Sequence, residues 1–347
     1  MVTAPSGEDL VTTVLHDTWS PMRHIRDRFR AWCTRRCSWR KALHPAHVRH
    51  PPEPAPNNAQ VVRLRLPKRV WDRARALQTQ HDARMRTAAP CRTPALSDAL
   101  AASLIEGLGV TLQGELTCGG MSRIFTTDDR NVLVKISDVS RGWSRHEPRN
   151  YASLVDHGLP AAGVAFARFR RGFLVIGVER LHCTVASVIR SVALDNGLYL
   201  DEVTRGLTLL LDALRAAETT FCDLSPDNIM CRVPPGDLVL IDPQFAAPTR
   251  ALEPGLGVAW ASGFDTMHLA LKIQAMGVAD RDPAVRRAAD ALCCALLGKD
   301  DPPPVEHMTQ WLLRDVPIGL RLAYAALQQQ QQQQPHRRTT KISTATP

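Results

Sequence analysis

The sequence predicts an α+β protein with two lobes, a small β-rich N-terminal lobe and a helical C-terminal lobe. Short apolar segments of strand-like composition recur between residues 110 and 178, and longer helical patterns follow them. The composition is that of a folded protein, with 44% hydrophobic and 22% charged residues. No apolar run reaches the roughly 20 residues that a membrane-spanning helix needs. A basic, partly disordered N-terminal region is expected to precede the two lobes.

The net positive charge of the chain lies in its first third. Residues 1–108 carry 18 Lys and Arg against 9 Asp and Glu, whereas residues 109–347 carry 25 of each. A concentrated positive field attracts nucleic acid, anionic membrane or acidic protein, and a neutral body favours none of these. The basic third therefore indicates docking to nucleic acid or to an acidic partner, with a solvated basic tail as the alternative.

The two ends of the chain are predicted to be disordered. Residues 1–58 are rich in Arg, Trp and His and end in the Pro-rich PPEPAPNN, so they are expected to form a basic, mostly disordered arm. Two cysteines and two histidines in this arm have the spacing C-x3-C-x6-H-x2-H, which is not a standard zinc-finger spacing, so a basic tail is preferred. Residues 329–347 form a Gln-rich tail.

Cysteine usage and the N-terminus indicate a cytoplasmic protein. The nine cysteines form no readable disulfide framework. MVTAPSGEDL has no basic segment leading into an apolar core, so no secretory signal is expected. Delivery to another cell by a non-classical route would leave no recognisable mark in the sequence.

Residues 59–108 are predicted to form a small strand-helix-helix module. The run VVRLRL at residues 61–66 alternates apolar and basic side chains, so a strand would place Arg63 and Arg65 on one face. Two helical stretches follow, the second capped by Ser97. This order resembles a ribbon-helix-helix DNA-binding module, and the resemblance implies DNA contacts by Arg63 and Arg65. A small helical extension packed on the next domain is the alternative.

The body of the protein, residues 109–328, begins with strands and continues with helices. Apolar runs predict five strands, at residues 110–116, 123–126, 132–136, 164–169 and 173–178. A helix is expected over residues 147–155, between the third and fourth strands. Beyond the fifth strand the patterns are mainly helical, including a long amphipathic helix around Leu207 and Leu211.

Three polar side chains supply the groups that phosphoryl transfer needs. Asp223 and Asn228 lie in FCDLSPDNIM, and Asp242 ends the apolar run LVLID further along the chain. Phosphoryl transfer from a nucleotide requires metal ions on the phosphates and an oriented acceptor hydroxyl. A carboxylate, an amide five residues later and a second carboxylate at the end of a strand meet this requirement.

These segments resemble the protein-kinase-like superfamily, which includes protein kinases and aminoglycoside-type phosphotransferases. DLSPDNIM is similar to the catalytic loop of that family, and IDPQF is similar to its metal-binding DFG segment. The resemblance implies a two-lobed protein-kinase-like fold that uses ATP and Mg²⁺. It also implies that Asp223 is the catalytic base and that Asn228 and Asp242 are the Mg²⁺ ligands.

The same resemblance implies a phosphate-binding region in the N-terminal lobe. Lys135 in VLVKI matches the lysine on the third strand that holds the α- and β-phosphates. Glu147 in the following helix is the expected ion-pair partner of Lys135, with Glu179 as an alternative. Gly119 and Gly120 lie between the first two strands, where a backbone without side chains can close over phosphates.

The resemblance further implies an adenine site and a support for the catalytic loop. The strand FLVIGVERL leads into a hinge that would place Glu179, Arg180 and Leu181 beside the adenine. Asp265 in GFDTMHLAL matches the carboxylate of the large C-lobe helix that braces the catalytic loop.

The sequence departs from the family pattern at several points. The glycine loop lacks G-x-G-x-x-G, Phe221 and Cys222 replace His-Arg before the catalytic Asp, and Ser225 replaces a common Lys. The segment between Asp242 and the Asp265 helix is short and has no A-P-E triplet. These departures favour an atypical, compact Ser/Thr protein kinase. A small-molecule kinase and a DNA-binding regulator with a nucleotide-sensing pseudokinase domain are the alternatives.

Overall fold

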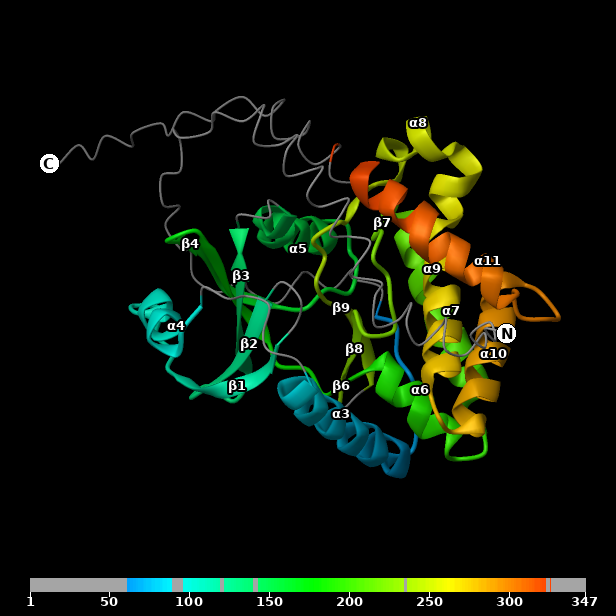
Figure 1. Ribbon diagram of the computed structural model, residues 1–347, viewed down its shortest axis with the longest axis horizontal. Coiled ribbons are helices and arrows are strands. Elements are labelled where there is room, and N and C mark those ends of the chain that lie inside the picture. Colours follow the sequence, from blue (N-terminus) through cyan, green and yellow to red (C-terminus); the bar gives the residue numbers. More distant parts are fainter. Residues whose placement is uncertain are drawn as a thin grey trace, which may run out of the picture.

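The structure of the protein is a computed structural model that describes residues 61–88, 96–118, 122–139, 143–233, 236–322 and 325. The predicted arm of residues 1–58 and the predicted tail of residues 329–347 lie outside the described residues. A β-rich lobe and a helical lobe lie side by side (Figure 1). Among the described residues, no helix combines the length and the apolar character that crossing a membrane requires.

The N-terminal lobe contains a five-stranded antiparallel sheet with the strand order β1-β2-β3-β5-β4. Its strands are β1 (Leu112–Cys118), β2 (Ser122–Thr127), β3 (Val132–Asp138), β4 (Val164–Arg170) and β5 (Phe173–Glu179). The five strands predicted from the apolar runs are confirmed, with ends close to those expected. The predicted helix over residues 147–155 is also confirmed, as α5 (Glu147–Asp156).

A short helix covers one face of this sheet. Helix α4 (Asp98–Ile105) begins at Ser97, whose side chain accepts a hydrogen bond from the Leu100 backbone N–H at 3.1 Å, as the sequence predicts. Leu104 of this helix is fully buried and belongs to one apolar cluster with Phe125 and Val134 of the sheet. Helix α4 is therefore part of the N-terminal lobe.

The C-terminal lobe is mainly helical. Its helices are α6 (Val185–Ala193), α7 (Leu200–Ala216), α8 (Glu253–Leu256), α9 (Val258–Ala279), α10 (Pro283–Leu297) and α11 (Val305–Gln310), with a π-helical turn at Trp311–Asp315. Short 3₁₀ helices span Trp143–His146 and Thr249–Ala251. The long amphipathic helix predicted around Leu207 is α7, and Leu207, Leu210 and Leu214 on its apolar side are buried.

Two small antiparallel sheets lie within the C-terminal lobe and carry the loops of the site. One has the order β6-β8-β9, with β6 (Cys183–Thr184), β8 (Ile229–Arg232) and β9 (Asp237–Leu240). The other pairs β7 (Thr219–Thr220) with β10 (Ala247–Pro248). The predicted two-lobed α+β architecture is thus confirmed, with an antiparallel sheet in one lobe and helices in the other.

Residues 61–66 pack against the C-terminal lobe. Val62 and Leu64 are buried while Arg63 and Arg65 are exposed, which confirms the predicted alternation of faces. The predicted strand is reduced to a single β-bridge between Arg63 and Asp237. The Arg63 guanidinium also pairs with the Asp237 carboxylate at 2.7 Å. The Arg63 side chain is therefore paired with the β8–β9 hairpin of the protein itself.

The helix that follows also belongs to the C-terminal lobe. Val70, Trp71 and Ala74 of α3 (Lys68–Ala88) share one apolar cluster with α6 and α7. The same helix contacts β1, so it lies against both lobes, as Figure 1 shows. The expectation of one strand-helix-helix module at residues 59–108 is corrected, because α3 and α4 bury their apolar sides on different lobes. The alternative, a helical extension packed on the body, describes this segment better.

Leu64 is expected to contribute strongly to stability although it lies outside the predicted body. Its side chain is 1% exposed and lies so close to Gly206 that a Cβ atom there would be 2.3 Å from Leu64 Cδ2. We expect Leu64→Ala to lower the free energy of unfolding by about 2–5 kcal/mol, because a cavity would remain in a close-packed site. Denaturant unfolding of the full chain measures this. Val61→Ala, at a 59% exposed neighbour, is the control, and equal small effects would contradict the prediction.

Candidate active site

The candidate catalytic loop, residues 221–228, connects β7 to β8. Its first two residues, Phe221 and Cys222, are fully buried, and Cys222 has a φ of +67°, in the left-handed region. Asp265 on α9 accepts hydrogen bonds from the backbone N–H groups of Phe221 at 2.6 Å and Cys222 at 2.9 Å. Asp265 thus holds the backbone at the start of the loop. A bond pair of this kind holds a strained backbone in place.

Burial changes the acidity of this supporting carboxyl group. Loss of solvent raises the pKa of Asp265 to about 7, although the two N–H donors oppose the change. Asp223, whose negative charge lies nearby, raises the pKa of Asp265 further. The hydrogen bonds from Phe221 and Cys222 therefore favour the charged form of a group that burial makes costly to ionise.

Asp223 and Asn228 lie together inside the loop. The Asn228 side-chain amide donates to the Asp223 backbone carbonyl at 2.8 Å, and the Asn228 backbone N–H donates to the Ser225 carbonyl at 3.0 Å. The Asp223 side chain is 36% exposed, so its carboxylate can meet a substrate. Because the amide nitrogen of Asn228 is used by the loop, its Oδ1 is the atom left for a ligand.

Asp242 lies beside Asn228 at the open end of the β8–β9 hairpin. Ile229 of β8 is paired with Leu240 of β9, and the Ile241 N–H donates to the Asn228 carbonyl at 3.0 Å. Asn228 therefore precedes one strand where Asp242 follows the other, so the pairing brings both to one end of the hairpin. Asp242 has a φ of +58°, an unusual backbone conformation for a residue other than glycine.

Lys135 joins the two lobes at this point. Its Nζ donates to Glu147 Oε1 at 2.8 Å and to Asp242 Oδ1 at 2.6 Å. The Lys135 side chain is 6% exposed and that of Glu147 is fully buried. The structure therefore pairs Lys135 with Glu147, the partner expected from the sequence, and not with Glu179. Figure 1 shows β3, which carries Lys135, next to α5, which begins at Glu147.

The protonation of this ion pair depends on its burial. Burial lowers the pKa of Lys135, but the charges of Asp242 and Glu147 raise it by more, so its pKa lies above the usual range. Burial raises the pKa of Glu147 to about 7, although the Lys135 charge opposes this change. Lys135 is therefore a permanent cation at neutral pH, whereas the pKa of Glu147 lies close to neutral pH.

Helix α5 also holds the segment that contains Asp242. The Asp242 backbone N–H donates to the Tyr151 hydroxyl at 2.9 Å, and the Asn150 amide donates to the Pro243 carbonyl at 2.6 Å. Gln244 donates a side-chain hydrogen bond to Asp242 Oδ1. Sequence reasoning missed these contacts. Asn150 and Tyr151 follow Glu147 by three and four residues, so a helical face shared with Glu147 is the signal that could have found them.

The two hinge residues Glu179 and Leu181 differ in their contacts. Glu179 pairs with Arg232 through two contacts of 2.6 Å and accepts a hydrogen bond from the Gly163 N–H at 3.1 Å. Burial raises the pKa of Glu179, but the Arg232 and Gly163 hydrogen bonds lower it by more, so the net change is downward. The carboxylate of Glu179 is therefore occupied. Leu181 is partly buried against a cluster that contains Tyr151.

Gly119 and Gly120 lie outside the described residues. The described residues Cys118 and Arg123 are paired across β1 and β2.

The oxygens at the open end of the hairpin fit Mg²⁺. Within the described segments, no three or more His, Cys, Asp and Glu side chains are grouped so that they could hold a metal ion. Asn228 Oδ1 and one oxygen of Asp242 remain beyond the hydrogen bonds described above. Mg²⁺ prefers oxygen ligands, keeps several waters and commonly binds one or two carboxylates together with substrate phosphates. A site with two protein oxygens suits a metal that arrives with a nucleotide.

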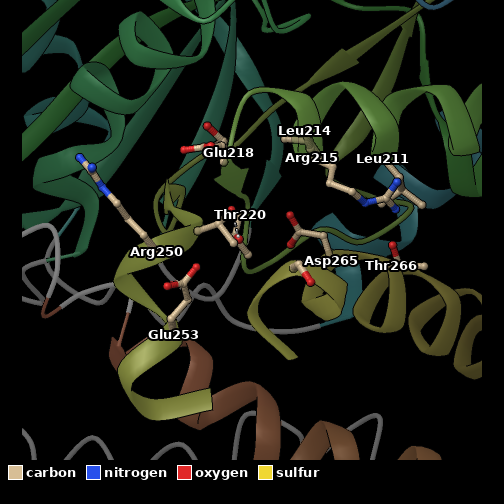
Figure 2. Close-up of a pocket in the computed structure, with 12 residues that line it drawn as sticks. Leu211, Leu214, Arg215, Glu218, Thr220, Arg250, Glu253, Asp265 and Thr266 are labelled. Carbon is tan, nitrogen blue, oxygen red and sulfur yellow. Dashed lines mark hydrogen bonds between the residues drawn. The ribbon is translucent and has the colours of Figure 1, made fainter. Parts of the chain in front are cut away.

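A separate cleft of about 210 Å³ reaches Asp265 from the helical lobe. Figure 2 shows Arg215 and Arg250 on opposite sides of this cleft, which Glu218 and Glu253 also line. Its two arginines are opposed by two glutamates and by Asp265, so the cleft has no electrostatic preference for an anion such as a triphosphate. The candidate nucleotide site therefore stays at the junction of the lobes, where Lys135 lies.

Comparisons with known proteins find a likeness among solved structures. No protein-family model matches the chain, and no curated protein matches it. Among solved structures, the chain is similar to the kinase domain of a Toxoplasma gondii specific rhoptry antigen. This match has 13% sequence identity and a TM-score of 0.35, and it covers 74% of this chain and 97% of the other. A likeness at this level carries no argument about the activity of this chain.

Proposed function

We propose that this chain is an ATP- and Mg²⁺-dependent phosphotransferase that transfers the γ-phosphoryl group of ATP to a hydroxyl group. The observation that carries the proposal is the bridge made by Lys135, whose ammonium contacts both Glu147 and Asp242. Glu147 is 12 residues away in the sequence and Asp242 is 107 residues away. A buried cation held by a carboxylate from each lobe, next to the Asp223 loop, is an arrangement suited to phosphate binding.

Each residue then has a defined task. Lys135 contacts the nucleotide phosphates, and Glu147 keeps the Lys135 side chain in position. Asn228 and Asp242 hold Mg²⁺, which neutralises charge that develops on the phosphates. Glu179 at the end of β5 and Leu181 just after it lie beside the adenine, and the backbone of Gly119 and Gly120 covers the phosphates.

Asp223 receives the proton in the transfer step. The acceptor hydroxyl lies against the Asp223 carboxylate, and the proton passes to Asp223 as the acceptor oxygen bonds to the γ-phosphorus. The bond between the γ-phosphorus and the bridging oxygen breaks, and ADP leaves. The loop backbone is held by its hydrogen bonds to Asp265 and by the bond from the Asn228 amide to the Asp223 carbonyl. These bonds keep Asp223 in one position, so little reorganisation is needed when the acceptor binds.

The preferred acceptor is a Ser or Thr hydroxyl of a protein. The basic first third of the chain can dock an acidic protein or nucleic acid and so compensate for a minimal acceptor groove. Phosphorylation of a small molecule, as in aminoglycoside-type kinases, is the second candidate, supported by the short segment between Asp242 and α9. A DNA-binding regulator has less support, because Arg63 pairs with Asp237.

An assay with γ-labelled ATP tests the proposal. The full chain is incubated with labelled ATP and Mg²⁺ beside the Asp242→Ala variant, and both ADP release and label on protein are followed. We expect ADP from the wild type and a loss of at least about 100-fold in the variant, because a metal ligand is removed. Label on protein supports a protein kinase. Equal ADP release by both proteins, or none from a wild type that binds ATP, contradicts the proposed activity.

A further inference from the structure

We propose that His268 is a positioning residue for Asp223, holding one oxygen of this carboxylate so that the other faces the acceptor hydroxyl. The inference rests on the proposed function, in which Asp223 receives the acceptor proton. It assigns a role to a buried polar side chain that has no role in the phosphoryl transfer described above.

His268 lies close to the Asp223 side chain. It is on α9, three residues after Asp265, and is fully buried. Its Nε2 is 3.7 Å from Asp223 Oδ1, slightly beyond hydrogen-bond distance. Residues three apart share a helix face, so both residues of α9 lie against the catalytic loop. Asp265 binds the loop backbone, and His268 lies near the Asp223 side chain. Catalytic hydrogen bonds are often long before substrate binds and shorten in the complex.

The ring nitrogens of His268 are unpaired within the described residues, where neither of them has a hydrogen-bond partner. A buried polar atom without a partner is costly, and such atoms in folded proteins call for an explanation. The Phe264 ring stacks on the imidazole, with centroids 6.0 Å apart and planes 22° from parallel. This contact fixes the plane of the ring, and Asp223, whose Oδ1 lies 3.7 Å from Nε2, is the partner within reach.

The surroundings favour a neutral imidazole that donates through Nε2–H. Burial lowers the pKa of His268, and the charge of Lys272 lowers it further, while Asp223 opposes both. Asp265 and Cys222 are further titratable groups at this junction of α9 and the loop. A neutral ring with its hydrogen on Nε2 can donate to Asp223 Oδ1 without placing a second charge in the core.

No lysine or arginine can take this role in the described part of the chain. There, no lysine or arginine nitrogen lies within 4.0 Å of the Asp223 carboxylate. Ser225, two residues after Asp223, is too short and uncharged to substitute for one. The Oδ1 atom would therefore be held by His268 alone, leaving Oδ2 for the proton of the acceptor.

Substitutions of different shape separate positioning from packing. His268→Gln keeps an N–H donor near the position of Nε2, whereas His268→Leu removes it and retains an apolar side chain. We expect His268→Leu to lower kcat about 10- to 100-fold with an unchanged KM for ATP, because Asp223 loses its orientation. His268→Gln is expected to restore most of kcat. The control is Gln274→Leu on the same helix, which removes a buried amide that donates to the Pro303 carbonyl at 2.7 Å.

A second readout does not require turnover. In full chain labelled with ¹⁵N-histidine, the His268 ring signals are assigned by their loss in His268→Gln. We expect the Nε2–H tautomer and a shift of the Nε2 signal in Asp223→Asn. Ring signals that do not change in Asp223→Asn, a wild-type kcat in His268→Leu, or a kcat loss in Gln274→Leu equal to that of His268→Leu would each overturn the inference. A wild type that forms no ADP overturns the proposed function instead, and the ring signals still decide whether His268 binds Asp223.

Discussion

Asp223→Asn is expected to lower turnover by about 10²- to 10⁴-fold while leaving ATP binding close to that of the wild type. The amide keeps the size of the side chain but cannot accept the acceptor proton as a carboxylate does. Asp223 does not contact Lys135, Glu147 or Asp242 among the contacts described, so the phosphate site should remain formed. Steady-state ADP formation and equilibrium ATP binding measure the two effects separately.

The control for this substitution lies in the same loop. Asp227→Asn removes an equal charge from an exposed residue four positions later, and we expect turnover within about threefold of the wild type. Turnover lost equally in both variants would show that loop charge, and not proton transfer to Asp223, controls the rate. Full activity of Asp223→Asn would remove its assigned role.

Lys135→Met is expected to have the largest effect on stability. The substitution leaves Glu147, which is fully buried, without its cation, and breaking a buried ion pair costs about 3–5 kcal/mol. Affinity for ATP should fall as well, because the phosphates lose their positive contact. Denaturant unfolding and nucleotide titration measure the two losses. Lys68→Met, which removes an exposed pair with Asp72, should change stability by no more than about 0.5 kcal/mol.

The effect of Lys135→Met should depend on pH. Burial already raises the pKa of Glu147 from 4.5 to about 7, and removing Lys135 removes a charge that lowers it. The folded variant then holds a proton that the unfolded chain releases above its ordinary pKa, so its stability falls as pH rises from about 5 to 8. This fall should be steeper than in the wild type. A variant that gains stability over the same range contradicts the prediction.

A double substitution separates stability from function. Lys135→Met with Glu147→Leu replaces the buried pair by apolar groups, which is often neutral or stabilising. We expect unfolding free energy close to that of the wild type and no recovery of ADP formation. Recovered turnover in this variant would show that neither residue takes part in phosphate binding.

Local patterns in the sequence predict most of the N-terminal lobe. The five strands and α5 are confirmed because alternation of apolar residues and short turns determine them over a few neighbours. The helix cap at Ser97 is also local, since its side chain bonds a backbone N–H three residues away. Features that depend on a few consecutive residues are therefore recoverable from a single sequence.

Contacts between distant segments are harder to predict. VVRLRL indicates a strand with a buried face, but this local sequence does not predict that Leu64 packs on Gly206 of α7 in the C-terminal lobe. In the same way, nothing in its local sequence links His268 to Asp223. The pairing of Lys135 with Glu147 was accessible only because a family resemblance supplied the correspondence that spacing alone lacks.

The binding of an ATP analogue with and without Mg²⁺ tests the central claim most directly. Titration calorimetry is performed on the wild type and on Asp242→Ala, with a slowly hydrolysed analogue in Mg²⁺ and in a metal chelator. If Asp242 and Asn228 hold Mg²⁺ beside the phosphates, Mg²⁺ should tighten binding by the wild type at least about tenfold and should have little effect on Asp242→Ala. Equal binding by the wild type in Mg²⁺ and chelator, or no binding at all, would contradict a metal-dependent nucleotide site at the junction of the lobes.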